Sequence, residues 1–118
     1  MQARARLKLP EDYSEKEFQA EIIKLAKDGG WLHYHTKNSK GSQPGFPDLV
    51  LVRDGRLIFM ELKTERGRIS ADQKKWLTEL RVLTSNGDDV LADVFRPSDL
   101  GRIRYFLTAN PRVKHVPE

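Results

Sequence analysis

Residues 47–63 read PDLVLVRDGRLIFMELK, two apolar runs joined by Asp-Gly at positions 54–55. A two-residue type I′ turn requires positive φ at both positions, so Asp-Gly between β-rich runs predicts a hairpin. If this pair forms the turn, counting outward along the strands places Asp48 opposite Glu61, with Lys63 on the same face. Directly opposed residues are about 4.5–5.5 Å apart at Cβ, and like charges at this distance destabilise a sheet. We therefore expect a cation, most simply a divalent metal ion, between the two carboxylates.

The composition describes one small domain without cysteine chemistry. The chain has 118 residues and no cysteine, which allows one hydrophobic core and excludes disulfides, thiolate metal sites and a cysteine nucleophile. The absence of cysteine fits a reducing interior, so we expect a cytoplasmic protein, in a bacterium or in a host cell. The basic N-terminal stretch 1–8 lacks the apolar run of a secretory signal, and no segment has transmembrane length, so we expect no membrane partner.

The charge balance allows a polyanionic partner without requiring one. Lys and Arg number 21 against 17 Asp and Glu, a formal net charge of +4. The basic residues gather in three segments that we expect to be loops or arms, 1–8, 37–40 and 66–68. Such segments suit the phosphates of a nucleic acid, but ordinary solvated surface is the alternative.

Start and stop signals predict three helices and four strands. Ser14 caps a first helix, Ser70 opens a second with Gln73 in capping-box position, and Pro97 starts the last. The predicted elements are a helix over 15–27, a strand over 31–36, the hairpin of 47–63, a helix from 70 to a stop at Asn86-Gly87, a strand over 90–95 and the final helix. The order α-β-β-β-α-β-α predicts an α/β fold, a mixed sheet with helices on both faces. We expect this domain over 14–108, between a basic arm over 1–13 and a flexible tail over 109–118.

Hydrophobic spacing indicates which side chains face the core, because apolar residues recur at three- and four-residue intervals in each helix. The predicted inward faces are Phe18, Ile22, Leu25 and Ala26; Trp76, Leu77, Leu80 and Leu83; and Leu100, Ile103 and Leu107. The first stripe extends to Gln19 and Glu15, and the second extends to Gln73. The hairpin strands are apolar on both faces, which predicts central strands that are covered on both sides.

Two carboxylates and a lysine at adjacent strand ends suit metal-assisted cleavage of a phosphodiester. Mg²⁺ and Mn²⁺ prefer hard oxygen ligands and keep several waters, so a few carboxylates and a substrate phosphate complete a site. A divalent ion makes water a usable nucleophile near neutral pH. Lys63 would orient or deprotonate that water, or stabilise charge on the phosphate. The alternative is that Asp48 and Glu61 bracket Lys63 in a surface ion-pair cluster.

The segment Gly45-Phe46-Pro47-Asp48-Leu49-Val50-Leu51, followed by Glu61-Leu62-Lys63, resembles the PD-(D/E)XK nuclease signature and, in detail, its VRR-NUC branch. Three further segments resemble that branch, namely Glu15 with Gln19, Asn38 to Gly45, and Ser70-Ala71-Asp72-Gln73. Together the matching segments span roughly residues 14–85. The resemblance implies a restriction-endonuclease-like fold.

The resemblance also implies roles for individual residues. It implies that Asp48, Glu61 and the backbone carbonyl of Leu62 hold Mg²⁺ or Mn²⁺, with Lys63 catalytic. Glu15 would reach the metal from the first helix, although the first turn of a helix also stabilises a solvated carboxylate. Gln19 is a site candidate that would equally satisfy a neighbouring backbone group, and Gln73 is one that would equally serve its capping box. Five residues flank the site and would grip phosphates without reading bases, namely Lys37, Asn38, Lys40, Arg66 and Arg68.

The expected function is a metal-dependent endonuclease that hydrolyses DNA phosphodiester bonds. Stand-alone members of this size look like phage or bacterial enzymes, which implies a Holliday-junction resolvase that works on branched DNA as a homodimer. A monomeric nuclease acting on flaps or duplex is the enzymatic alternative. A non-catalytic DNA-binding module on the same fold is the alternative from another class.

Overall fold

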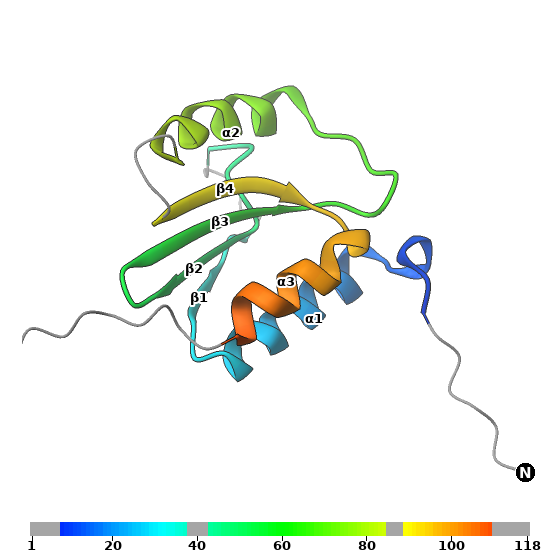
Figure 1. Ribbon diagram of the computed structural model, residues 1–118. Coiled ribbons are helices and arrows are strands. Elements are labelled where there is room, and N and C mark those ends of the chain that lie inside the picture. The colour runs from blue at the N-terminus through cyan, green and yellow to red at the C-terminus, as the bar shows by residue number, and fades with distance from the viewer. Residues whose placement is uncertain (1–7, 38–42, 85–88, 110–118) are drawn as a thin grey trace, which may run out of the picture.

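The structure is a computed structural model that describes residues 8–37, 43–84 and 89–109. A four-stranded sheet in the order β1-β2-β3-β4 has helices on both faces (Figure 1). Helices α1 and α3 pack together on one face, and α2 lies over β4 on the other. The elements are α1 Glu15–Asp28, β1 Leu32–His35, β2 Leu49–Arg53, β3 Arg56–Leu62, α2 Ala71–Thr84, β4 Val90–Phe95 and α3 Leu100–Thr108, with short 3₁₀ turns at Pro10–Asp12 and Pro97–Asp99.

The hairpin of β2 and β3 has the predicted turn and register. Asp54 and Gly55 have φ values of 51° and 78°, as a type I′ turn requires. Arg53 pairs with Arg56, and the antiparallel register runs outward to Leu49 opposite Met60. The next residue along β2 is Asp48 and the next along β3 is Glu61, so the two carboxylates are brought to the same end of the hairpin.

Helix α1 begins where its capping box predicts. The Ser14 hydroxyl accepts a hydrogen bond from the Glu17 amide at 3.0 Å, and the Glu17 carboxylate accepts one from the Ser14 amide at 3.0 Å. These two bonds satisfy backbone donors that the first turn leaves without helical partners. The start of the helix is therefore fixed at Glu15, which is the first residue of α1.

The main core lies between the sheet and the α1–α3 layer. Its buried members come from the predicted faces of both helices and from one face of the hairpin. They include Phe18, Ile22, Leu25, Ala26, Leu49, Leu51, Ile58, Met60, Leu62, Ile103 and Leu107. A smaller cluster lies under α2, where Leu77 and Ala92 are buried. No helix in the described ranges is long and apolar enough to cross a membrane.

Some boundaries and faces differ from the prediction. The final α-helix begins at Leu100, after the 3₁₀ turn that starts at Pro97, so the proline opens the turn and not the helix. The first strand is shorter than 31–36, since only 32–35 pair with β2. The predicted helix stop at Asn86-Gly87 lies outside the described residues, as do most of the predicted N-terminal arm and C-terminal tail.

Two predictions about burial are wrong. Leu83 is 46 % exposed, because α2 buries a narrower stripe centred on Leu77. Strand β2 is covered on one face only, since Leu49 and Leu51 are buried whereas Val52 is 40 % exposed. The cause is that α2 packs over β4 and leaves the neighbouring face of β1 and β2 open.

Candidate active site

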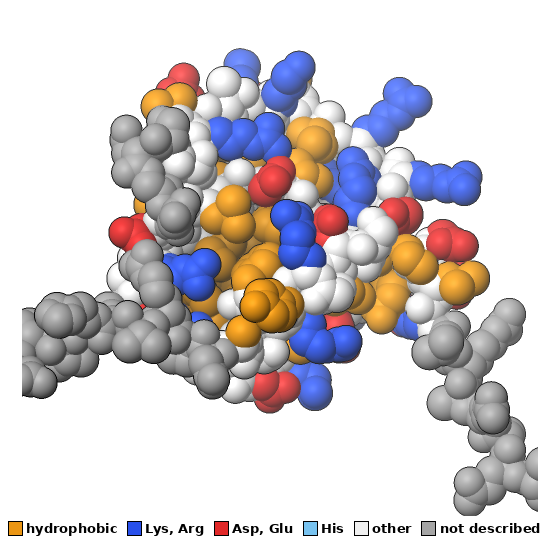
Figure 2. Space-filling view, in the orientation of Figure 1, with side chains coloured by type: hydrophobic (Ala, Val, Ile, Leu, Met, Phe, Trp, Pro, Cys, Tyr) orange, Lys and Arg blue, Asp and Glu red, His pale blue; other side chains and the backbone are white. Residues whose placement is uncertain are grey.

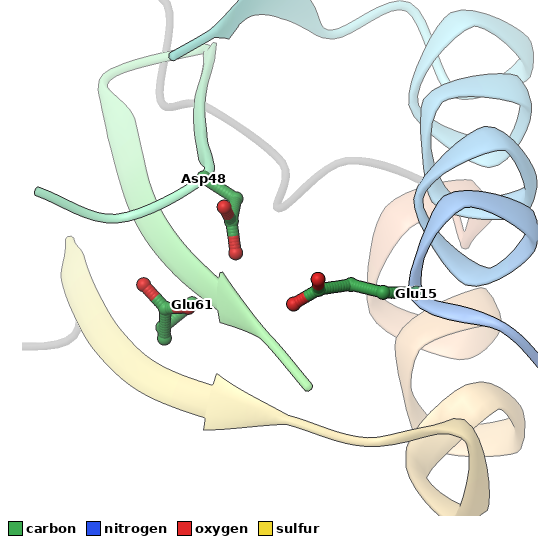
Figure 3. A group of neighbouring side chains, drawn as sticks. All are labelled: Glu15, Asp48 and Glu61. Atoms are coloured by element: carbon green, nitrogen blue, oxygen red, sulfur yellow. The ribbon is translucent and has the colours of Figure 1, made fainter. Parts of the chain in front are cut away.

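Three carboxylates from three different elements converge at one end of the sheet. Glu15 opens α1, Asp48 directly precedes β2, and Glu61 lies near the end of β3. One oxygen of each lies within 4.8 Å of the others, and Figure 3 shows the side chains pointing toward one another. Glu15 is exposed, Asp48 is half-buried and Glu61 is buried. The cluster therefore has a solvent-facing side and an enclosed side.

Asp48 is held by backbone contacts to both neighbouring strands. Its carboxylate accepts a hydrogen bond from the Leu62 amide at 2.7 Å, and its carbonyl accepts one from the Thr36 amide at 2.9 Å. The Thr36 hydroxyl donates to the Pro47 carbonyl at 2.7 Å. These contacts fix the carboxylate between β1 and β3 before any ligand is present. The Leu62 carbonyl, predicted as a metal ligand, belongs to the backbone segment that joins Glu61 to Lys63.

The loop that leads to Asp48 is anchored on α2. Gly45 has a φ of +93°, and a Cβ there would lie 2.4 Å from the Asp72 carbonyl carbon, so only glycine fits. Phe46 packs edge-on against Phe59 and Trp76, with ring centroids 6.1 Å and 5.1 Å away. The close approach of this loop to α2 explains why glycine precedes Phe46. Because the loop leads directly into Asp48, its contacts with α2 help to hold Asp48 in place.

Glu61 is a buried carboxylate, and only one of its two oxygens accepts a hydrogen bond from the described residues. The residue is 1 % exposed; Oε2 accepts a hydrogen bond from Gln73 Nε2 at 3.2 Å and lies 4.0 Å from Lys63 Nζ. Oε1 is buried and has no hydrogen-bond partner among the described residues. Burial is the main cause that raises the pKa of the Glu61 carboxyl to about 9; a hydrogen bond that the protonated carboxyl would make to Asp48 and charge repulsion from Asp48 add to the rise, and the Lys63 charge opposes it. A buried acceptor without a partner is costly, and a divalent cation among these carboxylates would supply the partner, so the residues fit a metal site.

Gln73 makes the contacts of its capping box and also contacts Glu61, a residue of the candidate site. The side-chain Oε1 of Gln73 accepts a hydrogen bond from the Ser70 backbone amide at 2.8 Å, and the backbone amide of Gln73 donates one to the Ser70 hydroxyl at 3.1 Å. These two bonds complete the capping box of α2. The Nε2 of Gln73 is left free to donate to Glu61. The helix start and the site are therefore joined through one side chain.

A cavity of about 360 Å³ opens beside Glu15 and Asp48. Its other lining residues are Lys16, Gln19, His35, Thr36, Lys37 and Phe46. Gln19 and Lys37 were predicted near the site and line this cavity. Lys16 and His35 were not predicted there. His35 is brought there by the pairing of β1 with β2, which sets it opposite Leu49, and Lys16 follows Glu15 on α1.

The remaining predicted DNA contacts lie on the loop between β3 and α2 or outside the described residues. Arg66 and Arg68 are exposed on the loop between β3 and α2. Figure 2 shows Lys and Arg side chains projecting from the part of the surface where this loop runs in Figure 1. Asn38 and Lys40 lie outside the described residues. Basic side chains of the described part thus line the cavity beside Glu15 and Asp48 and project from the loop that follows Lys63.

The model of the VRR-NUC domain family matches residues 6–95, which is most of the chain. The chain belongs to the VRR-NUC family. VRR-NUC domains are nuclease domains of the PD-(D/E)XK type, so the resemblance and the restriction-endonuclease-like fold are confirmed, and DNA is the implied partner. The matched range includes the three carboxylates, Lys63 and Gln73. Searches of curated proteins and of solved structures found no match.

The raised pKa of Glu61 predicts a stability that depends on pH and on metal. In the unfolded chain this carboxyl titrates near 4.5, and in the metal-free fold its pKa is about 9. The folded state holds the proton more tightly, so this contribution is fully present below the unfolded pKa and is lost as the pH rises through the folded pKa. We expect the Tm of the metal-free VRR-NUC protein to fall between these pH values by about 5 °C or more, and Mg²⁺ or Mn²⁺ to restore it.

Differential scanning calorimetry across this pH range, with chelator or with metal, measures the effect. Glu61→Gln keeps the shape of the side chain and removes the titration, so it should flatten the pH dependence and reduce the response to metal. A parent Tm that rises across the same range in chelator, or a Glu61→Gln variant that keeps the full parental slope, would contradict the prediction.

Proposed function

We propose that this VRR-NUC protein is a Mg²⁺- or Mn²⁺-dependent endodeoxyribonuclease that hydrolyses phosphodiester bonds in branched DNA. The observation that carries the metal dependence is the buried, unpartnered oxygen of Glu61 beside two further carboxylates. A fold that only bound DNA would gain nothing from keeping a carboxylate buried against another carboxylate. The same cluster next to a lysine is suited to phosphate chemistry.

In this proposal Asp48, Glu61, Glu15 and the Leu62 carbonyl hold the ion. When bound, a divalent cation supplies Lewis acidity, which activates water and neutralises charge on the phosphate. The Leu62 amide keeps the Asp48 carboxylate turned toward Glu61, and Gln73 occupies the Glu61 oxygen that faces α2. These two bonds leave the other oxygens available as ligands, and they orient the carboxylates before DNA arrives.

Lys63 is the catalytic residue of the proposal. Its side chain is 15 % exposed and its ammonium lies 4.0 Å from Glu61, so it is held at the edge of the carboxylate cluster. From there it would orient the attacking water or stabilise negative charge on the phosphate. In the reaction the water oxygen forms a bond to phosphorus, the bond from phosphorus to the leaving oxygen breaks, and the leaving oxygen takes up a proton.

The basic residues of the cavity and of the loop that follows Lys63 would hold the DNA backbone. Lys16, His35 and Lys37 line the cavity on the α1–β1 side, and Arg66 and Arg68 are exposed on the β3–α2 side. Contacts of this kind position a phosphate backbone without reading base sequence. We therefore propose recognition of DNA by shape, which agrees with a preference for branched substrates.

The proposed assembly is a homodimer that resolves four-way junctions. A junction with two-fold symmetry needs two related cuts, and two copies of a chain with one carboxylate cluster in its described part supply them. The competing proposal is a monomer that cuts a flap or a duplex once. Both use the same chemistry at Glu61 and Lys63, so the substrate and the symmetry of the cuts distinguish them.

The test is cleavage of labelled four-way junction, flap and linear duplex with Mg²⁺, Mn²⁺ or EDTA, comparing the parent with Glu61→Ala. We expect metal-dependent, paired and symmetric nicks on the junction, and none from the variant. Single nicks on flaps or duplex would instead support the monomeric nuclease. Binding that is independent of metal and gives no cleavage of any substrate would refute the enzyme and leave the DNA-binding module.

A further inference from the structure

The loop between β3 and α2 is held in place by one arginine from a distant part of the chain. Arg96 Nη1 donates hydrogen bonds to the carbonyl oxygens of Thr64 at 2.8 Å, Gly67 at 2.8 Å and Glu65 at 3.3 Å. Arg96 directly follows β4 and is only partly exposed. A guanidinium group is planar and always charged, so it suits a set of converging carbonyl oxygens.

Further bonds clamp the same two segments together. The Lys63 amide donates to the Phe95 carbonyl at 3.1 Å, and the Glu65 carboxylate accepts from the Ser98 amide at 3.0 Å. The Arg96 amide in turn donates to the Asp99 carboxylate at 2.8 Å, which fixes the turn itself. In Figure 1 the chain leaving β3 and the chain leaving β4 separate at this point, so the clamp lies where the two strands end.

The clamped loop runs near the side chain of Lys63. A Cβ placed on Gly67 would lie 2.9 Å from Thr64 Oγ1 and 3.5 Å from Lys63 Cδ. Gly67 therefore lies near the aliphatic part of Lys63, whose ammonium lies near Glu61. Since Arg96 holds the carbonyls of Gly67 and of Thr64, which directly follows Lys63, the position of the backbone around Lys63 depends on Arg96.

We propose that Arg96 is a positioning residue of the nuclease site, which acts through the Thr64–Gly67 backbone to hold Lys63 beside Glu61. This inference rests on the proposed function, because it assumes that Lys63 takes part in the reaction. The family match ends at residue 95, so Arg96 lies just beyond it. In this proposal Arg96 contacts neither the cluster of Glu15, Asp48 and Glu61 nor the DNA.

The test is a double-mutant cycle on Arg96 and Lys63, read as kcat and KM for DNA cleavage at saturating metal. We expect Arg96→Ala to lower kcat about ten- to hundredfold, because small misplacements of catalytic groups cost this much, with a smaller change in KM. In a Lys63→Met background the same substitution should change kcat by less than about twofold, since the group that it positions is gone. A residue that only stabilised the fold would lower kcat by the same factor in both backgrounds.

Two companion variants keep the test informative if Arg96→Ala folds poorly. Arg96→Lys keeps the charge without the planar group, so its kcat should lie between those of the parent and of Arg96→Ala. Addition of guanidinium ion below its denaturing range should partly restore Arg96→Ala and leave Lys63→Met unchanged. Arg104→Ala removes an exposed arginine of α3 that pairs with Glu21 at 3.8 Å, and it should cleave at the parental rate.

A readout without DNA or metal separates this inference from the proposed function. The Gly67 amide donates to the Thr64 carbonyl at 3.1 Å, and its hydrogen exchange should accelerate in Arg96→Ala but not in Arg104→Ala. Unchanged exchange, or an Arg96→Ala variant with parental kcat, would overturn the positioning of Lys63 while leaving the nuclease intact. A parent that cleaves no DNA would overturn the proposed function, even if the exchange result shows that Arg96 orders the loop.

Discussion

Asp48→Asn is expected to reduce DNA cleavage by about 10³-fold while leaving the fold intact. The asparagine oxygen can still accept the hydrogen bond from the Leu62 amide, which the aspartate accepts at 2.7 Å. The substitution removes one of three clustered carboxylates and with it a metal ligand of the proposed site. Loss of a single group that stabilises charge in an active site costs about 10²–10³ in rate, and loss of metal affinity adds to this.

Above about pH 9, where Glu61 is ionised in the metal-free fold, the same substitution should stabilise the protein in the absence of metal. Asp48 is one cause of the raised pKa of Glu61, so its neutralisation relieves a repulsion that the metal-free fold carries once Glu61 has lost its proton. Activity and metal-free Tm should therefore move in opposite directions, as is common where a site is kept for function and not for stability. If the residues formed only a surface ion-pair cluster, Asp48→Asn would lower the metal-free Tm, because the members of such a cluster stabilise one another.

Single-turnover cleavage, Mn²⁺ titration calorimetry and thermal unfolding measure the three effects on one set of samples. Asp28→Asn is the matched control, because Asp28 is exposed at the far end of α1 and pairs only with Lys24, at 3.5 Å, among its described ion-pair contacts. This control should match the parent in rate and in Mn²⁺ affinity. An Asp48→Asn variant that bound Mn²⁺ as tightly as the parent would remove Asp48 from the proposed ligand set.

The features predicted correctly from the sequence are those set by local chemistry. The hairpin register followed from a two-residue turn, and the φ values at Asp54 and Gly55 are those that the turn type demands. The start of α1 followed from its capping box. Both signals involve residues within a few positions of one another, so no knowledge of tertiary packing was needed to align Asp48 with Glu61.

The features that sequence reasoning missed depend on contacts between distant segments. Val50 and Val52 look like buried strand residues, but the placement of α2 over β4 leaves Val52 exposed, and no periodicity reports that placement. His35 joins the cavity only through the pairing of β1 with β2. Arg96 reaches carbonyls 29 to 32 positions earlier in the chain, in a turn without a recognisable motif. Hydrogen bonds from a side chain to distant backbone carbonyls do not depend on the type of the accepting residue, so no local sequence pattern predicts them.

Gln73 shows how one side chain can complete a capping box and also contact a candidate site residue. Its capping-box spacing and its place on the inward stripe pointed to different partners, yet the amide group has an acceptor and a donor and uses them separately. The capping bond fixes the side chain at the helix start, and the remaining donor then meets Glu61. A role in forming the helix therefore supports the role that we propose near the metal.

Lys63→Met is expected to lower kcat by about 10²–10⁴-fold, the range typical of a group that transfers or orients a proton. Methionine preserves the aliphatic length of the side chain near Gly67, so the loop should keep its place. Metal affinity should not fall, because the variant removes a positive charge 4.0 Å from Glu61 and so strengthens the attraction for a cation. This pattern is the opposite of that expected for Asp48→Asn, which loses rate and affinity together.

Single-turnover rates measured over a range of Mn²⁺ concentrations separate the two patterns. For Lys63→Met the maximal rate should fall while the half-saturating Mn²⁺ concentration stays equal or decreases. Lys27→Met, an exposed lysine in the last turn of α1, controls for the loss of one positive charge and should cleave normally. If Lys63→Met reached the parental rate at any Mn²⁺ concentration, the lysine would be acting on metal binding alone. The carboxylates would then carry the chemistry without it, and Arg96 would have no catalytic group to position.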